Sequence, residues 1–131
     1  MWKQADNNYL ILLICGNGTS NRRFVPFLYL ENDGEAKFKP LKLTRFLKES
    51  DGTVQRFEPD VGVGRTFPNS DQWFDPVTKE LRIWTRLLGG ASPCGTKGNY
   101  RLQNNEFVLQ EFTARFECDP TKQGDYEKLY P

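Results

Sequence analysis

The stretch from Trp73 to Cys118 constrains the fold more than any other part of the chain. It reads in order as a turn, a strand, a glycine-rich loop, a second strand, a two-residue turn and a long third strand. Glu80 to Leu88 shows the clearest alternation of apolar and polar residues, which is typical of a strand with one buried face. The residues on the other face of this strand are Arg82, Trp84 and Arg86. The stretch therefore predicts an antiparallel meander.

The remaining residues also carry strand signals separated by turn residues. No window keeps a helical period over three turns, because Pro or Gly interrupts each one. Asp51-Gly52 predicts a hairpin, Asp75-Pro76 a type I turn, and Asn104-Asn105 a tight hairpin turn with positive φ angles. We expect one all-β domain over residues 1–131, an antiparallel, meander-rich sandwich or open barrel of about seven to eight strands.

Three details of these strands can be predicted further. Tyr9 to Cys15 is a continuous apolar run, as expected of a buried central strand. Pro26 interrupts a strand-like segment and cannot donate to a ladder, so we expect an edge strand or a bulge there. In Glu106 to Cys118 the apolar parity changes midway, which predicts a bulge near Gln110-Glu111. A Glu at that position would be either a partly buried carboxylate or a solvent-facing one.

Charge and composition exclude several classes of function. The 18 basic and 17 acidic residues give a net charge of +1, without the basic excess that nucleic acids or anionic membranes require. The chain has no histidine, which excludes Ser-His-Asp and Cys-His catalysis and histidine-containing zinc sites. The longest apolar run is too short to span a bilayer. We expect no enzyme, no cofactor, no metal, no nucleic-acid partner and no membrane span.

The three cysteines bear on both the fold and the compartment. Cys94 follows a glycine-rich loop and Cys118 ends the last strand, so both lie at element ends, where a bridge forms most easily. We expect a Cys94–Cys118 disulfide and an extracytoplasmic location, with any export leader outside the given sequence. Cys15 would then be a buried free thiol. The alternative is three reduced cysteines in a cytosolic protein.

The loop from Gly89 to Asn99 is the first candidate for function. Its glycines, Pro93 and Cys94 make a long excursion between paired strands, and long loops of this kind often carry function. A bridge at Cys94 would hold the loop rigid and lower the entropy cost of binding a partner. The alternative is a plain connection.

The parity of Trp84 gives a second candidate. Trp84 shares one face of its strand with Arg82 and Arg86. On a solvent-facing sheet these side chains would form a cation–π strip of the kind that binds sugars or peptides. On a face turned into a sandwich, Trp84 would be a core residue.

Several motifs of the second half occur in the same order in a known family. They are the turn beginning Phe74-Asp75-Pro76, the strand-ending Arg86, Cys94-Gly95, the aromatic Tyr100, Phe107-Val108-Leu109 and the late Cys118. In this order they resemble the bacterial exported family called the domain of unknown function 1176 family. The resemblance implies an extracytoplasmic β domain and no particular activity. Pro93 stands where the family loop has an Asp, so no role of that Asp carries over.

The same meander is similar to bacterial periplasmic lysozyme-inhibitor domains. In those domains a Ser- and Gly-rich loop with a nearby Tyr enters the enzyme cleft. Ser92, Gly95, Gly98 and Tyr100 echo that pattern.

Together these patterns predict a non-enzymatic extracytoplasmic β domain that binds a protein or glycan partner through the loop 89–99. The candidate binding residues are Arg82, Trp84, Arg86, Ser92, Gly95 and Tyr100. A lysozyme-inhibitor-like protein and a purely structural accessory domain are the alternatives. A hydrolase that uses paired carboxylates is a more distant third reading.

Overall fold

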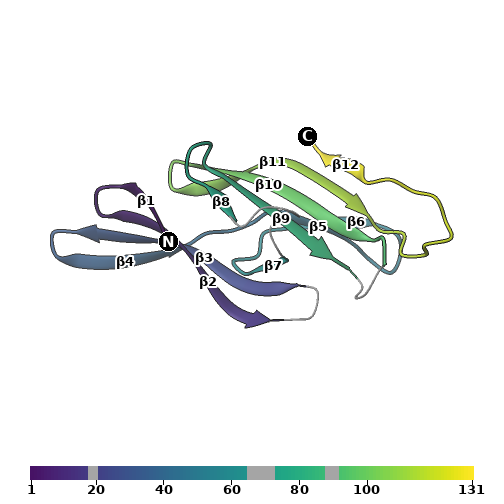
Figure 1. The fold of residues 1–131 in the computed structure, drawn as a ribbon, viewed down its shortest axis with the longest axis horizontal. Coiled ribbons are helices and arrows are strands. Elements are labelled where there is room, and N and C mark those ends of the chain that lie inside the picture. The colour runs from purple at the N-terminus through teal and green to yellow at the C-terminus, as the bar shows by residue number, and fades with distance from the viewer. Residues whose placement is uncertain (18–20, 65–72, 88–91) are drawn as a thin grey trace.

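A computed structural model of the chain describes residues 1–17, 21–64, 73–87 and 92–131 (Figure 1). Over these residues the chain forms twelve strands, all paired antiparallel, and no helix. The all-β prediction is confirmed, and the arrangement of sheets is consistent with a sandwich or open barrel. Within the described ranges no helix has the length and apolar character needed to cross a membrane.

The strands form two five-stranded sheets and one small sheet. Sheet 1 contains β1 (Trp2–Ala5), β2 (Asn8–Asn17), β3 (Arg22–Asn32), β4 (Glu35–Pro40) and, paired with β3, β7 (Gly62–Gly64). Sheet 2 contains β8 (Phe74–Asp75), β9 (Glu80–Arg86), β10 (Gly95–Gln103), β11 (Glu106–Arg115) and β12 (Glu127–Tyr130). Sheet 3 is the hairpin of β5 (Arg45–Lys48) and β6 (Val54–Phe57). The count exceeds the expected one because strands of two to four residues are too short to show alternation.

Sheet 2 is the predicted meander. Its β8–β9 turn closes with a hydrogen bond from Lys79 N–H to the Asp75 carbonyl (2.8 Å), and its β10–β11 turn has positive φ at Asn104 and Asn105. Hydrogen bonds from the backbone N–H groups of the β8–β9 turn, Val77 first, lower the pKa of the Asp75 carboxyl. Both turns therefore have the local chemistry that their sequences indicate.

The predicted bulge in the last long strand is confirmed. Asn99 pairs with Glu111 and Tyr100 pairs with Leu109, so Gln110 is the extra residue of β11. The bulge resets the parity of β11, and buried residues therefore occur at odd positions before it and at even positions after it. Glu111 is exposed at this point, as a solvent-facing Glu at a bulge would be.

Pro26 corrects one prediction, because β3 is not an edge strand. It pairs with β2 along one side and with both β4 and β7 along the other. β4 ends opposite Phe27 and β7 ends opposite Phe24, so Pro26 faces the gap between them. The Pro26 carbonyl accepts a hydrogen bond from Leu41 N–H across this gap (2.9 Å). In an antiparallel strand, the backbone nitrogen and the carbonyl of one residue point to the same side. The Pro26 nitrogen therefore faces the gap, where no neighbouring strand offers an acceptor, and its missing N–H costs no ladder hydrogen bond.

The apolar run at Tyr9 to Cys15 corrects a second prediction. It forms most of β2, inside sheet 1, but only one of its faces is covered: Leu10 is fully buried, whereas Leu13 is 54% exposed. Cys15 is the bulge residue of β2, since Ile14 pairs with Phe24 and Gly16 with Arg23. Its thiol is free and exposed, not buried. A continuous apolar run does not reveal whether one face or two will be covered.

The buried apolar side chains form one cluster between sheets 1 and 2. Trp2 packs against Phe74 with ring centres 5.5 Å apart, and Phe24 packs against Trp73 at 5.1 Å, so aromatic pairs join the two sheets directly. The buried members of the cluster are Leu10, Phe24, Leu28, Leu41, Leu43, Phe74, Leu81, Ile83, Tyr100, Phe107, Leu109, Phe112 and Ala114.

Tyr100 places a polar group inside this core. Its side chain is 2% exposed, and its hydroxyl donates a hydrogen bond to the Thr44 carbonyl (2.7 Å). Burial raises the pKa of Tyr100, against a smaller opposing effect of the Arg45 charge, so the hydroxyl stays protonated and remains a donor. Gly98 makes room for it, because a Cβ there would lie 2.7 Å from the Tyr100 oxygen. The hydrogen bond from Tyr100 to Thr44 holds the connection between β4 and β5 against sheet 2.

The predicted disulfide is present, with Cys94 and Cys118 joined across 24 positions of sequence. Cys94 is 1% exposed and directly precedes β10, while Cys118 follows β11. The bridge therefore ties the end of the loop before β10 to the start of the C-terminal segment.

Replacing Tyr100 by Phe should lower the free energy of unfolding by about 1–3 kcal/mol, because the buried Thr44 carbonyl loses its donor. Urea denaturation measures this loss. Tyr130→Phe is the matched control, since the Tyr130 hydroxyl makes no side-chain hydrogen bond within the described residues and its removal should change little. Equal stabilities of the two variants would contradict the proposed role of the buried hydrogen bond.

Removing the disulfide with Cys94→Ser and Cys118→Ser together should lower the free energy of unfolding by about 3–4 kcal/mol, because the unfolded chain regains the conformational entropy that closing a loop of this length removes. Cys15→Ser should leave it nearly unchanged, because that thiol is exposed and unbridged. Thiol titration of the denatured, unreduced protein should give one free thiol. Three free thiols would contradict the bridge.

Candidate functional site

The outward face of sheet 2 brings aromatic and basic side chains together. On β9, Arg82, Trp84 and Arg86 alternate with buried residues, so they share one face, as the alternation predicts, and that face points away from the core. Lys97 of β10 pairs with Trp84 across the sheet, and Tyr126, just before β12, lies beside both. We call these five residues the Trp84 face. Trp84 is half-buried on this face and is not a core residue.

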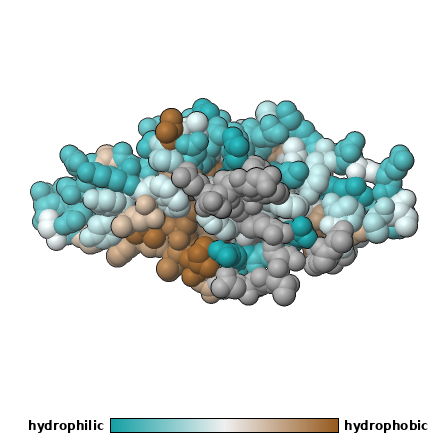
Figure 2. All heavy atoms as spheres, viewed as in Figure 1, coloured by the Kyte–Doolittle hydropathy of each residue, from teal (hydrophilic) through white to brown (hydrophobic). Residues whose placement is uncertain are grey.

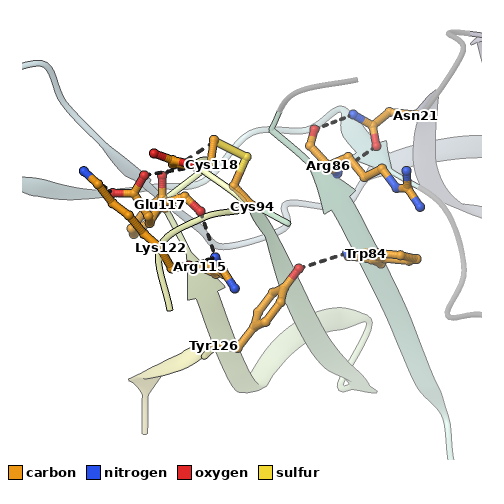
Figure 3. Close-up of a disulfide and its surroundings, with 11 residues drawn as sticks. Asn21, Trp84, Arg86, Cys94, Arg115, Glu117, Cys118, Lys122 and Tyr126 are labelled. Atoms are coloured by element: carbon orange, nitrogen blue, oxygen red, sulfur yellow. Dashed lines mark hydrogen bonds and ion pairs between the residues drawn. A yellow bond between two sulfur atoms is a disulfide. The ribbon is translucent and has the colours of Figure 1, made fainter. Parts of the chain in front are cut away.

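Two cation–π contacts and one hydrogen bond hold the Trp84 face in shape. Figure 3 shows the hydrogen bond between Trp84 and Tyr126. The Arg86 guanidinium lies 4.9 Å from the centre of the Trp84 ring. The Lys97 ammonium lies 4.2 Å from the centre of the Tyr126 ring. The Trp84 indole N–H donates to the Tyr126 hydroxyl at 3.2 Å, which links the two pairs. The rings are therefore oriented before any partner arrives.

Gly95 is required where the two rings meet. A Cβ on this residue would lie 2.7 Å from the Thr85 carbonyl oxygen and 2.8 Å from the Tyr126 hydroxyl. The indole nitrogen of Trp84 would be 3.2 Å away. Gly95 thus contributes to the Trp84 face by leaving space for the Trp84–Tyr126 hydrogen bond.

Arg115 holds the segment that delivers Tyr126 to this face. Its Nε donates to the Glu117 carbonyl (3.1 Å) and one Nη to the Lys122 carbonyl (3.0 Å), while the other Nη donates to the Gly124 carbonyl. Three carbonyls of one loop thus converge on a single guanidinium, and the disulfide anchors the same loop at its start. This explains how a polar segment without regular structure can place Tyr126 reproducibly.

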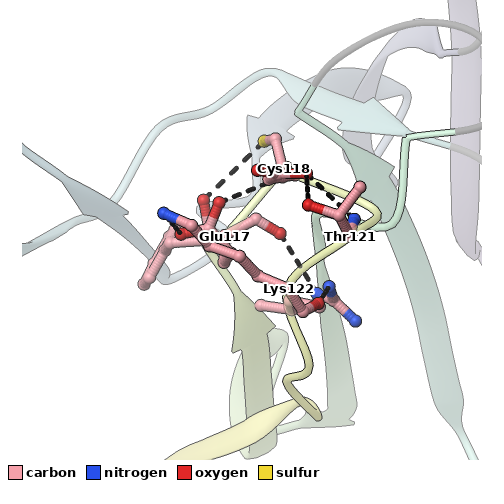
Figure 4. A network of polar contacts seen from close by, with 7 residues as sticks. Glu117, Cys118, Thr121 and Lys122 are labelled. Atoms are coloured by element: carbon pink, nitrogen blue, oxygen red, sulfur yellow. Dashed lines mark hydrogen bonds and ion pairs between the residues drawn. The ribbon is translucent and has the colours of Figure 1, made fainter.

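Side-chain contacts further define this loop (Figure 4). Glu117 and Lys122 form an ion pair at 3.8 Å. The Asp119 carboxylate accepts hydrogen bonds from the hydroxyl and the backbone N–H of Thr121 (2.7 and 2.9 Å), and these bonds lower the pKa of Asp119. Such local turns stabilise the loop independently of the sheets.

At the Arg82 end of the Trp84 face, a carboxylate of the protein itself pairs with the basic group. Arg82 lies 3.1 Å from the Glu80 carboxylate, which also holds Arg101 at 3.2 Å. At the opposite end, the Asn21 side chain donates to the Arg86 carbonyl (2.8 Å) and accepts from its N–H (3.0 Å). The start of β3 therefore positions the strand end from which the Arg86 side chain emerges.

The loop predicted over residues 89–99 is shorter than expected. Strand β10 begins at Gly95, so the second half of that segment is strand, and residues 88–91 lie outside the described residues. Ser92 is half-buried just before the disulfide. Tyr100, also expected to bind a partner, is a core residue whose hydroxyl is already used, and it does not reach the surface.

Sequence reasoning missed three contributors, Lys97, Tyr126 and Arg115. Lys97 has the outward parity of β10 and would have been found if that strand had been extended back to Gly95. No local pattern places Tyr126 beside Trp84. The Arg115 contacts depend on the course of the loop, for which the sequence carries no periodic signal.

The described ranges can also be searched for metal-binding and hydrolytic groups. They contain no group of three or more His, Cys, Asp or Glu placed to hold a metal ion. One surface hollow is lined by both Glu58 and Glu106. Glu58 lies 3.7 Å from Arg56, and Glu106 lies 3.8 Å from Lys39. A hydrolytic pair needs one protonated carboxyl facing one carboxylate, and here each carboxylate has its own cation.

Comparison with known proteins adds no relative: no family model, no curated protein and no solved structure matches this chain. The resemblance to the exported family therefore remains a prediction that rests on its motifs.

Gly95→Ala should lower the free energy of unfolding by about 1–3 kcal/mol, because the new methyl group meets the fixed Thr85 carbonyl and the Tyr126 hydroxyl. Thermal or urea denaturation measures the change. Gly124→Ala is the control, since its Cβ would lie 3.8 Å from Arg115, an ordinary contact distance. If both variants are as stable as the wild type, the close packing described at Gly95 is wrong.

Proposed function

We propose that this chain is a non-enzymatic, extracytoplasmic binding domain that recognises a protein or glycan partner through the Trp84 face and the adjoining residues Ser92–Cys94. The observation that carries the proposal is the outward Trp84 ring, held by the Tyr126 hydroxyl and flanked by Arg86. An amphipathic ring fixed in advance offers a large contact area at low entropic cost. The basic groups beside it provide donors for the polar groups of a sugar or a peptide.

The proposed compartment is supported by the disulfide. Cys94 and Cys118 are bridged, and such bridges persist in oxidising environments outside the cytosol. The same bridge stiffens the segment between the glycine-rich loop and β10, beside the Trp84 face. The same disulfide thus supports both the proposed compartment and the proposed binding surface.

A lysozyme-inhibitor role has less support than general glycan or protein binding. Of the four residues that echo the inhibitor loop, Gly98 and Tyr100 face the core, and Gly95 is covered by Trp84 and Tyr126. Ser92 is the member left near the surface. A partner that approaches here therefore meets mainly the aromatic and basic side chains of the Trp84 face.

Thermal-shift screening against soluble cell-wall glycan fragments and against lysozymes should identify a partner that raises the melting temperature. Trp84→Ala should then weaken binding of that partner by about tenfold to a hundredfold, as expected for loss of a central aromatic contact. Phe38→Ala provides the matched control, because it removes another exposed aromatic ring, from sheet 1. Titration calorimetry measures both affinities. Equal losses in the two variants, or no loss in either, would exclude the Trp84 face as the binding surface.

A further inference from the structure

Sheet 1 has a second apolar face, turned away from the core. On β2 and β3, residues of one parity contribute to the shared core, and the residues of the other parity from Tyr9 to Leu13 and from Val25 to Tyr29 are also apolar. On β4, Phe38 and Pro40 continue this second set. The registers place Tyr9, Tyr29 and Phe38 in one row across the strands. The next rows complete a surface that we call the outer apolar face, consisting of Tyr9, Ile11, Leu13, Val25, Phe27, Tyr29, Phe38 and Pro40.

This face is in contact with solvent. Phe38 is 63% exposed and Leu13 is 54% exposed, and Tyr9, Ile11, Val25, Phe27 and Tyr29 are half-buried. Phe38 lies 5.3 Å from the Tyr29 ring and 5.5 Å from the Phe27 ring, centre to centre, so the aromatic groups form a continuous layer. Figure 2 shows the apolar surface gathered on the side of the molecule where β2 and β3 lie. Apolar patches of this extent on a monomer mark interaction surfaces.

The charges at the two ends of β3 indicate what covers the face. The outward residues of β3 are, in order, Arg23, Val25, Phe27, Tyr29 and Glu31. A basic residue therefore stands at one end, an acidic residue at the other, and apolar residues between them. Arg23 and Glu31 are exposed, and neither forms an ion pair with another described residue.

We propose that the outer apolar face binds a second copy of this chain in a two-fold symmetric dimer. A two-fold axis in the plane between the sheets, passing by Phe27 and perpendicular to β3, stacks β3 on β3 of the partner in opposite directions. Phe27 then packs on Phe27 of the partner subunit, and Arg23 faces Glu31 of the partner subunit. Symmetry creates the same pair twice. Stacked sheets lie about 10 Å apart, a distance that extended Arg and Glu side chains together can span.

The area of the outer apolar face sets the expected affinity of the dimer. From Arg23 to Glu31 the strand rises about 26 Å, and the three strands β2, β3 and β4 span about 14 Å, which outlines roughly 360 Å² on each copy. A stable interface buries about 600–1,000 Å² per partner, so the area of this face is well below that range. The dimer is therefore concentration-dependent. Because this face lies on sheet 1 and the Trp84 face on sheet 2, dimerisation and partner binding use separate surfaces.

Sedimentation velocity from micromolar to millimolar protein should show the wild type passing from monomer to dimer. Arg23→Glu alone and Glu31→Arg alone should each weaken self-association by about tenfold or more, because each places like charges opposite one another across the axis. An equimolar mixture of these two variants should recover a heterodimer, since the charges are again complementary at both ends. Lys48→Glu, on sheet 3, is the charge-change control and should associate like the wild type.

Four outcomes would overturn the proposal: a monomer at every concentration, growth of aggregates beyond the dimer, no recovery on mixing the two charge variants, or an unchanged dimer in Phe38→Asp. Co-sedimentation with phosphatidylcholine vesicles by a protein that stays monomeric would overturn it in favour of a membrane surface. The measurements involve none of the Trp84 face residues. Failure of the dimer is therefore distinguishable from failure of the proposed binding function.

Discussion

Packing of the two five-stranded sheets against each other is the constraint on which the rest of the structure depends. Each sheet has two faces, and the shared core covers one face of each. The other two faces must therefore meet water or a partner. Sheet 2 presents basic and aromatic residues on its outer face, whereas sheet 1 presents an uncharged apolar layer. Both proposed interactions follow from this difference between the outer faces. Each uses the face of its sheet that is not part of the shared core.

The C-terminal segment shows how the sheets organise irregular chain. After β11 the backbone leaves the sheet, turns at Asp119 and returns as β12 along β11. The disulfide holds its start, the Arg115 guanidinium holds its middle, and the strand pairing of β12 holds its end. Tyr126 lies between the last two anchors. The Trp84–Tyr126 hydrogen bond is thus a consequence of covalent and backbone constraints rather than of a strong contact of its own.

The alternation of apolar and polar residues along the strands accounts for most of the structural features that the sequence predicts. Alternation in Glu80 to Leu88 correctly grouped Trp84 with Arg82 and Arg86 on one face but left open whether that face was covered, and the parity change in the last long strand correctly placed the bulge at Gln110. Pro26 misled the prediction, because the missing donor of a proline can face a gap inside a sheet as well as its edge. The apolar run of β2 misled it for a related reason. Local pattern reports which residues share a face, but not how many faces another sheet will cover.

By itself, the sequence determined the fold class, the hairpin turns and the bulge, because alternation and turn chemistry are properties of neighbouring residues. It favoured the pairing of Cys94 with Cys118, but the alternative of three reduced cysteines stayed open until the structure placed the two side by side. Only the tertiary structure decided that Tyr100 is buried, that Cys15 is exposed and that Tyr126 meets Trp84. Those outcomes depend on which distant strands approach one another. Such approaches are set by the packing of whole sheets, and no local stretch of residues carries that information.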